Sequence, residues 1–349
     1  MKIREINIKN YKSLVNFKLS SPNAFSVFVG PNAAGKSNIF EALELFAGLF
    51  KNNEFLTETL NSYGSLNDLI NKKCSGQTEL SFEFIFDDIN IAGIYKIDLD
   101  KEGNKFITDV KSGNKRFAAE LKNSDNITDG KGSFGLNHSK EYKTFILNHS
   151  RLFFQKETLV KQKIVSDTKL SLDAGNLEKV LGRLLKNETT RAEIIEWLQL
   201  LIPEFEKIEI IPGELSGIDN MLIYERGTNK PFTKNLISDG TFNILSILAA
   251  VYQKDESQFI SIEEPENGLN PKVIKELVNL FRQKCKEGHF IWLNTHSQTL
   301  VSELTTEEII LVDKKNGETI AKQIKGMNLH GLKMDEALLT NALGGGIPW

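Results

Sequence analysis

The sequence predicts an α/β protein that combines a parallel or mixed sheet core, an antiparallel β-meander and a small helical section. Three observations favour this class. Strand-like and helix-like segments alternate from residue 236 onward, which is typical of a parallel sheet covered by helices. Residues 77–120 contain three strand-like segments separated by polar turns. Residues 173–201 carry apolar side chains at helical spacing.

The composition indicates an ordinary globular protein. The 349 residues suit one large domain or two interleaved ones. The two cysteines, Cys74 and Cys285, lie far apart, so neither a disulfide framework nor a zinc site is expected. We expect a cytoplasmic protein without a membrane partner, since no signal peptide and no apolar run of roughly 20 residues is visible. The net charge of −3 gives no support for nucleic-acid binding, although a local basic groove stays possible.

The first 50 residues predict strands, a turn and a helix in that order. Alternating apolar residues indicate one strand around residues 3–8 and another around residues 17–19. Residues 25–29 (FSVFV) are typical of a buried third strand. A glycine-rich turn follows at residues 30–37, and residues 39–50 have the apolar spacing of a helix.

The later elements follow from the same patterns. Residues 122–143 are polar and predict a loop, whereas residues 144–154 predict a strand. The remaining predicted elements are two helices ending at Pro203, strands at 206–212 and 220–225, a helix at 241–252, a strand at 258–262, a helix after Pro271, a strand at 289–293 and a short helix after Thr295. Heptads do not persist beyond three or four turns, so no long coiled coil is expected.

Residues 30–37 (GPNAAGKS) match the pattern GxxxxGK[ST] between a predicted strand and a predicted helix. Gly30 and Gly35 allow the backbone to wrap closely and to direct its N–H groups at phosphate oxygens. Lys36 reaches the β- and γ-phosphates, and the Ser37 hydroxyl binds Mg²⁺. The pattern therefore predicts a site for a nucleoside triphosphate with Mg²⁺.

An apolar strand that ends in two carboxylates follows later in the chain. Residues 258–264 read QFISIEE and precede Pro265. In a phosphate-loop protein one such carboxylate supports Mg²⁺ and the next polarises the attacking water, so we expect these roles for Glu263 and Glu264 respectively. Aspartate is the usual residue at the first position. The alternative is a solvated acidic turn, because Glu266 adds a third charge.

Two further segments have features of ligand sites. Residues 236–241 (LISDGT) precede an apolar helix, where Ser238 is a candidate N-cap and Gly240 permits close approach of another backbone. Such a helix start binds anions, although it is also what any capped helix presents. His296 follows the strand 289–293, at the sheet edge where ligands bind, and its imidazole suits contact with a γ-phosphate or the attacking water.

Together these segments resemble the ABC ATPase heads of the RecF, SMC and OLD-like group, including its small AAA-type ATPases. GPNAAGKSN resembles Walker A, LISDGT a variant of the LSGGQ signature, FISIEEPENGLNP Walker B with the D-loop, and LNTHS the H-loop. The opening INIKNYKSL and the helical stretches AGNLEKVLGRLL and EIIEWLQLLIPEFEKIEI are also similar. The resemblance covers nearly the whole chain, except residues 51–143 and the tail. It implies an ABC-ATPase head fold and hydrolysis of ATP to ADP and phosphate with Mg²⁺.

The resemblance also implies roles for single residues. Glu264, His296 and Lys36 would be catalytic. Mg²⁺ would be held by Ser37, Glu263 and Gln155, where Gln155 is either the Q-loop glutamine or an exposed loop amide. Asn270 occupies a D-loop position where aspartate is commoner. The residues that would contact nucleotide are Lys12, Ser13, Gly30, Asn32, Ala33, Ala34, Gly35, Lys36, Ser37 and Asn38, with Ser238, Asp239 and Gly240 of the opposite protomer.

Within this resemblance we expect four parts of the chain. Residues 1–155 would form the N-terminal part of the nucleotide-binding domain with the meander, 156–204 a helical subdomain, 205–326 the C-terminal part, and 327–349 a tail. The gap between Walker A and signature is too short for the coiled coil of an SMC protein. The chain after His296 is too short for the Toprim domain of an OLD nuclease, so nuclease activity would belong to a separate chain.

The split motif set predicts an ATP-linked homodimer or larger homo-oligomer, since the Ser238 turn has no phosphate to bind within its own chain. Three roles stay open. The first is the ATPase subunit of a prokaryotic anti-phage defence system that controls a separate effector such as a nuclease or toxin. The second is a RecF-like DNA repair ATPase, which the net charge disfavours. The third is an ATP-binding scaffold with little turnover, which the presence of Glu264 and His296 disfavours.

The last residues predict a mobile apolar anchor. Three glycines at 344–346 precede Ile347, Pro348 and Trp349. Such an end suits a partner's pocket. The equal alternative is that it folds back on the protein's own core.

Overall fold

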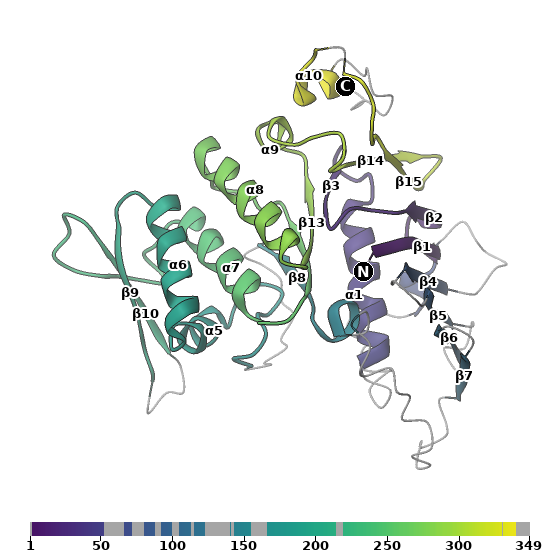
Figure 1. The fold of residues 1–349 in the computed structure, drawn as a ribbon, viewed down its shortest axis with the longest axis horizontal. Helices are drawn as coiled ribbons and strands as arrows, with labels where there is room; N and C mark the ends of the chain where they lie inside the picture. The colour runs from purple at the N-terminus through teal and green to yellow at the C-terminus, as the bar shows by residue number, and fades with distance from the viewer. Residues whose placement is uncertain are drawn as a thin grey trace. The chain divides into compact units, whose positions relative to one another are not determined.

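The computed structural model describes residues 2–51, 66–71, 80–87, 92–99, 105–112, 115–122, 140, 143–154, 166–213, 219–329 and 331–339. The chain forms two compact units (Figure 1). Unit 1 contains Met1–His149 and Leu304–Trp349, and unit 2 contains Ser150–Glu303. In neither unit do the described residues include a helix that is long and apolar enough to cross a membrane. The predicted C-terminal anchor lies outside the described residues.

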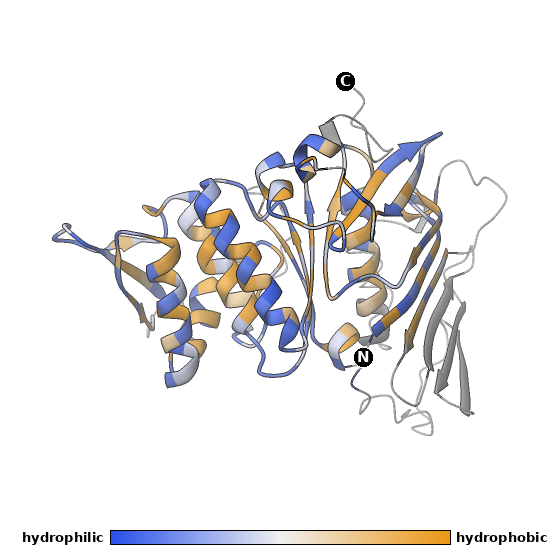
Figure 2. Ribbon diagram, turned by 45° about the horizontal axis from the view of Figure 1, so that its top comes forward, coloured by the Kyte–Doolittle hydropathy of each residue, from blue (hydrophilic) through white to orange (hydrophobic). Residues whose placement is uncertain are grey.

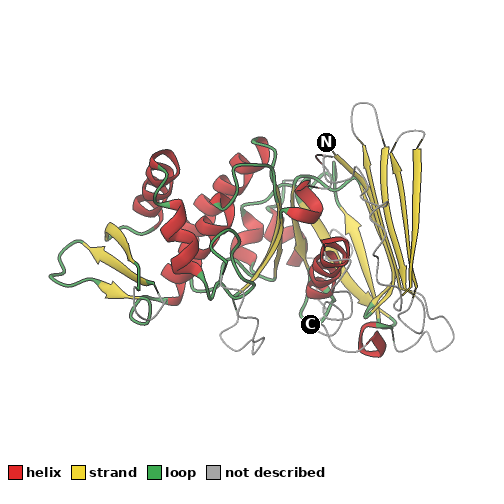
Figure 3. Cartoon of the chain, turned by 90° about the horizontal axis from the view of Figure 1, so that it is seen from below, coloured by secondary structure: helices red, strands yellow, loops and turns green. Residues whose placement is uncertain are grey.

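Unit 1 contains an antiparallel sheet with the strand order β2-β1-β4-β5-β6-β7 (Figure 3). The sequence predicted the meander as three strands; the structure confirms these and adds a fourth, β7. The first meander strand pairs with β1, so that the meander extends the N-terminal hairpin. The strands are β1 (Lys2–Tyr11), β2 (Leu14–Ser20), β4 (Leu80–Asp87), β5 (Ala92–Leu99), β6 (Lys105–Ser112) and β7 (Lys115–Lys122).

Three other strands of unit 1 support the turn at residues 30–35. β3 (Phe25–Val29) is buried along its whole length and pairs in parallel with β14 (Ile309–Lys315). β14 pairs antiparallel with β15 (Glu318–Gln323), and this hairpin was not predicted from the sequence. Helix α1 (Lys36–Lys51) starts directly after the turn. The unit also contains the short helices α3 (Leu66–Leu69) and α10 (Met334–Leu339).

The prediction of a strand over residues 144–154 was wrong in its first part. Lys143–Leu147 forms a π-helical turn, labelled η2, and the strand β8 covers only His149–Phe153. Three consecutive residues of η2 are buried, and the ring centroid of Phe145 lies 4.7 Å from that of Phe86. Consecutive apolar residues carry no alternation, so their pattern alone does not separate a buried strand from a buried helical turn.

Unit 2 confirms the predicted alternation of strands and helices. β12 (Phe259–Glu263) and β13 (Phe290–Thr295) are parallel and fully buried, and β8 lies beside β12. Helix α8 (Pro271–Lys286) connects β12 to β13 in the chain, and Figure 2 shows hydrophobic and hydrophilic residues on different sides of it. The other elements are α5 (Leu177–Leu184), α6 (Glu188–Leu201), β9 (Phe205–Ile211), β10 (Asn220–Glu225), β11 (Phe232–Thr233), α7 (Asp239–Tyr252), α8 (Pro271–Lys286) and α9 (Gln298–Ser302).

Candidate functional site

The glycine-rich loop between β3 and α1 has the shape that the sequence predicted. Gly35 has φ +99°, and a Cβ at this position would lie 2.0 Å from Thr319 Oγ1 and 2.7 Å from Ser13 Oγ. A Cβ on Gly30 would lie 2.0 Å from the carbonyl oxygen of Val312. Both glycines are therefore required by the packing of the loop, and the loop leads directly into the N-terminus of α1, where anions are favoured.

Lys36 turns its side chain back over this loop. The residue is 7% exposed, and its Nζ donates hydrogen bonds to the carbonyl oxygens of Gly30 (2.6 Å) and Pro31 (2.9 Å). A buried ammonium requires acceptors. Phosphate oxygens are stronger, charge-assisted acceptors than carbonyls, so this lysine is placed to exchange loop carbonyls for phosphate.

The other loop residues predicted to contact nucleotide differ in their exposure to solvent. Asn32, Ala33 and Ser37 are exposed, whereas Ala34 is buried. Ala33 adopts a left-handed conformation with φ +62°. Ser37 is an exposed residue in the first turn of α1, as the predicted Mg²⁺ contact requires.

A threonine that sequence reasoning missed holds the loop from β15. The Oγ1 of Thr319 donates to the carbonyl oxygen of Ala34 (2.8 Å) and lies 2.6 Å from Ser13 Oγ. Ser13 also accepts a hydrogen bond from Asn38 Nδ2 (2.8 Å), and its carbonyl accepts one from the Thr319 N–H. Ser13 and Asn38, both predicted to contact nucleotide, therefore form the wall of the loop. No local signal marked Thr319, because its partners are about 300 residues away.

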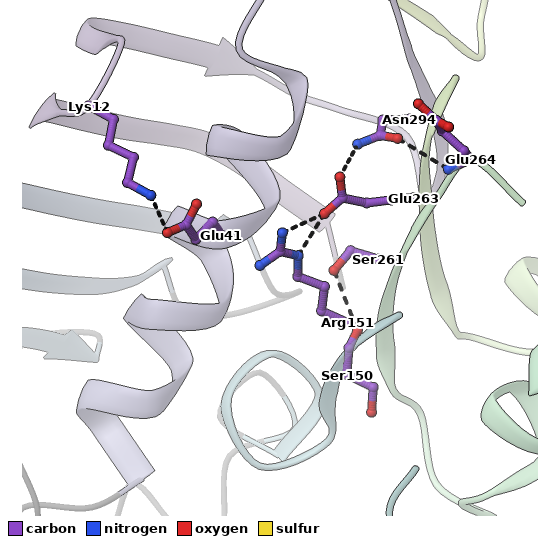
Figure 4. A network of polar contacts seen from close by, with 8 residues as sticks. All are labelled: Lys12, Glu41, Ser150, Arg151, Ser261, Glu263, Glu264 and Asn294. Carbon is purple, nitrogen blue, oxygen red and sulfur yellow. Dashed lines mark hydrogen bonds and ion pairs between the residues drawn. The ribbon is translucent and has the colours of Figure 1, made fainter. Parts of the chain in front are cut away.

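Lys12 lies at the corner between β1 and β2 with φ +45°. Its ammonium forms an ion pair with Glu41 on α1 (Figure 4). The structure thus joins the corner to the helix of the phosphate loop within unit 1. Contact of Lys12 with phosphate stays a prediction.

In unit 2, Glu263 at the end of β12 lies in a buried polar network (Figure 4). The residue is 2% exposed. Its Oε1 accepts from Arg151 Nε (2.8 Å) and Nη2 (2.5 Å), and its Oε2 accepts from Asn294 Nδ2 (3.0 Å). Sequence reasoning missed Arg151, because a single arginine within a predicted strand has no local pattern that connects it with a residue 112 positions later.

Glu264 and His296 are brought together, as expected for two residues at one sheet edge. His296 Nδ1 lies 3.1 Å from Glu264 Oε1, and both side chains are partly exposed. Asn267 Nδ2 donates to the other carboxylate oxygen of Glu264 (3.0 Å). Glu264 has φ +47°, a conformation that residues other than glycine adopt only when their surroundings enforce it.

Glu266, two residues after Glu264, is buried in the protein. Its Oε1 accepts a hydrogen bond from the hydroxyl of Thr295, while its Oε2 is buried without a hydrogen-bond partner. Burial raises the pKa of Glu266, and the nearby charge of Glu264 adds to the increase. This third carboxyl is therefore not part of a solvated acidic turn, which was the alternative reading of the sequence.

The predicted signature turn begins helix α7. The prediction that Ser238 is the N-cap is confirmed, since its Oγ accepts a hydrogen bond from the Thr241 N–H (3.1 Å). Ser238 and Asp239 are exposed, and Leu236 just before them is 68% exposed. An accessible helix N-terminus with a neighbouring exposed apolar side chain suits a contact with another molecule.

The start of α7 is tied to the loop that follows Glu264. A Cβ on Gly240 would lie 2.4 Å from the carbonyl oxygen of Gly268. Asn243 Nδ2 donates to the carbonyl oxygen of Asn267 (2.8 Å), the residue whose side chain contacts Glu264. The signature turn and the catalytic candidate are thus linked within unit 2 through Asn267.

Asn270 and Gln155 are the remaining residues of the predicted nucleotide site. Asn270 is the N-cap of α8, where its side chain accepts from the Val273 N–H (3.0 Å). Gln155 lies outside the described residues, so its role stays a prediction.

The donor set fits nucleotide phosphates better than it fits direct coordination of Mg²⁺ by Glu263. The phosphate loop offers glycines, a lysine and an exposed serine. Both oxygens of Glu263 already accept hydrogen bonds, and the residue is buried. Among the described residues, no group of three His, Cys, Asp or Glu is arranged to hold a metal ion.

The fold and these motifs define an ABC-type ATPase head. The chain belongs to the family described as "AAA domain, putative AbiEii toxin, Type IV TA system", whose model matches residues 25–302. A chromosome partition protein Smc of Methanococcus voltae is 36% identical over 104 residues; this match covers 29% of the present chain and 8% of that relative's length.

Solved structures of SMC heads share the fold. An SmcHead bound to the C-winged helix domain of ScpA has 15% identity and a TM-score of 0.59, with 92% of this chain and 97% of that chain covered. The SMC head domain from Thermotoga maritima has 13% identity and a TM-score of 0.53, with 93% and 100% covered. An Smc head with an extended coiled coil, bound to a ScpA domain derived from Pyrococcus furiosus, has 14% identity and a TM-score of 0.53, with 98% and 99% covered.

Proposed function

We propose that the protein binds and hydrolyses ATP and that ATP brings two copies together head to head. The observation that carries the proposal is the exposed, serine-capped start of α7 beside the exposed Leu236, in a chain that also has a complete phosphate loop. The γ-phosphate would be held by Lys36 of one copy and by Ser238, Asp239 and Gly240 of the other. ATP would then favour the closed dimer because it binds that state better than the separate copies.

Glu264, Lys36 and Ser37 would have different roles in hydrolysis. Glu264 would accept the proton of the attacking water, with His296 and Asn267 fixing its carboxylate. Lys36 would stabilise the charge that develops on the phosphate oxygens. Mg²⁺, when bound with ATP through Ser37, would neutralise part of the phosphate charge. Hydrolysis would remove the shared γ-phosphate and release the two copies.

We further propose that the ATPase controls a separate effector in a prokaryotic defence system. The family description, which names a putative toxin and a toxin–antitoxin system, supports this role. Two of the SMC heads of similar fold are bound to ScpA domains, which supports the use of such a head as a platform for a partner protein. The effector would be a nuclease or toxin on another chain.

The proposal is tested by changing Glu264 to Gln, which keeps the shape of the side chain and removes the base. We expect ATP turnover to fall by about 100-fold or more, and the variant to accumulate as an ATP-bound dimer. The measurements are phosphate release and molar mass by light scattering, each with and without ATP and Mg²⁺.

The matched control is Glu206→Gln, a change of an exposed glutamate on β9. It should behave like the wild type in both measurements. A monomeric Glu264→Gln variant in saturating ATP would refute the dimer switch. A large assembly without nucleotide would favour the scaffold role instead.

A further inference from the structure

The buried network around Glu263 contains an ion pair with Arg151, a residue that none of the predicted nucleotide-binding motifs includes. The side chains of Arg151 and Glu263 are 9% and 2% exposed. Arg151 directs both Nε and Nη2 at one oxygen, Oε1. Two donors of one guanidinium on the same oxygen keep the carboxylate of Glu263 in one orientation.

The other oxygen of Glu263 determines how the amide of Asn294 is turned. A carboxylate only accepts hydrogen bonds, so the NH₂ group of Asn294 must face it, at 3.0 Å. The Oδ1 of Asn294 therefore points the opposite way. It accepts a hydrogen bond from the backbone N–H of Glu264 (3.2 Å), as does the Asn294 carbonyl oxygen (3.0 Å).

These two bonds fix the peptide plane that leads into the left-handed Glu264. A glutamate at φ +47° persists only where neighbouring groups enforce it, and both acceptors of its N–H belong to Asn294. Because the backbone of Glu264 is fixed, its carboxylate lies where His296 and Asn267 reach it. The order of contacts is thus Arg151, Glu263, Asn294, Glu264 (Figure 4).

We propose that Arg151 is a positioning residue for hydrolysis, and that Glu263 transmits its effect to Glu264 rather than binding Mg²⁺ directly. The inference rests on the proposed ATPase function. It changes the role expected for Glu263 from the sequence, because its oxygens serve Arg151 and Asn294. Loss of the Arg151–Glu263 ion pair, or of the Asn294 side chain, should slow ATP turnover without weakening the binding of ATP or Mg²⁺.

Two variants test this without leaving a buried charge unpaired. The double change Arg151→Gln with Glu263→Gln removes both charges together, and Asn294→Ala breaks the link to Glu264 while the ion pair stays intact. In both we expect kcat to fall by about 10-fold to 100-fold, as for a misplaced catalytic group. Combining all three changes should lower kcat little further than either variant alone does, because the residues act through one link.

The second readout is binding without turnover. The affinity for the non-hydrolysable analogue AMP-PNP, titrated by calorimetry at several Mg²⁺ concentrations, should stay within about twofold of the wild type in both variants. Lys207→Gln is the control, since it removes an exposed ion pair on β9 and should change neither readout.

The outcomes separate the two proposals. A normal kcat in either variant would overturn the positioning role. A strong shift in the Mg²⁺ dependence of the double variant would make Glu263 a direct ligand and overturn the second half of the inference. Absence of turnover in the wild type would instead refute the proposed ATPase function.

Discussion

At the scale of single residues, contiguous motifs were predictable and isolated partners were not. Gly30, Gly35 and Lys36 follow one another in a pattern whose chemistry fixes their spacing, and the loop has the expected shape. Arg151 and Thr319 act on residues 112 and 285 positions away, so only the folded chain brings them into contact. The roles assigned to the predicted residues stay proposals.

Thr319 provides a prediction at this scale. Thr319→Val keeps the shape of the side chain but leaves the Ala34 carbonyl and the Ser13 hydroxyl without this partner. We expect the free energy of unfolding to fall by roughly 1–3 kcal/mol and the affinity for ATP to fall with it, because the loop loses its clamp. Urea denaturation and calorimetric titration measure the two effects.

The control for this change is Thr228→Val, which removes a hydrogen bond at an exposed turn. It should leave ATP affinity unchanged. Equal ATP affinity in Thr319→Val and wild type would show that β15 does not support the nucleotide site.

At the scale of elements, the alternation in unit 2 was predictable because short apolar strands alternate there with longer segments that carry helical spacing. The error at residues 144–147 arose where three consecutive buried residues carry no period. The β14–β15 hairpin was missed because no motif drew attention to it, although it supports the phosphate loop. The four-part division at residues 155, 204 and 326 stays a prediction.

Helix α7 provides a prediction at this scale. Ser238→Ala removes its N-cap and should lower the free energy of unfolding by about 1 kcal/mol. Asn187→Ala removes the corresponding cap of α6, where the side chain accepts from Thr190 N–H (3.0 Å), at a similar cost.

The two cap variants should differ in assembly. Only Ser238→Ala should weaken the ATP-linked dimer, because only α7 is proposed to face the nucleotide of a second copy. Thermal melting and light scattering with ATP are the measurements. Equal dimer strength in both variants would count against the signature role of this turn.

At the scale of the whole molecule, the buried Glu266 couples stability to pH. Its pKa is raised from 4.5, so the folded state binds more protons than the unfolded state above that pH. The free energy of unfolding therefore loses a contribution as pH rises through the pKa of the folded state. Glu266→Gln removes this dependence and should be more stable relative to the wild type at pH 8 than at pH 5.

Denaturant titrations at the two pH values measure this difference. Glu206→Gln serves as the exposed control and should follow the wild type at both. A stability difference between Glu266→Gln and wild type that does not change with pH would contradict the assignment of the titrating group.

The close approach of Gly240 and Gly268 has a consequence for timing. A Cβ on Gly240 would overlap the carbonyl oxygen of Gly268, and a hydrogen bond from Asn243 to Asn267 ties the same two segments. In the proposed dimer, the turn that senses a neighbour's nucleotide would carry with it the loop that holds the chain's own base. Hydrolysis at the two sites of the dimer would then be coupled, so that both ATP molecules are hydrolysed together rather than independently.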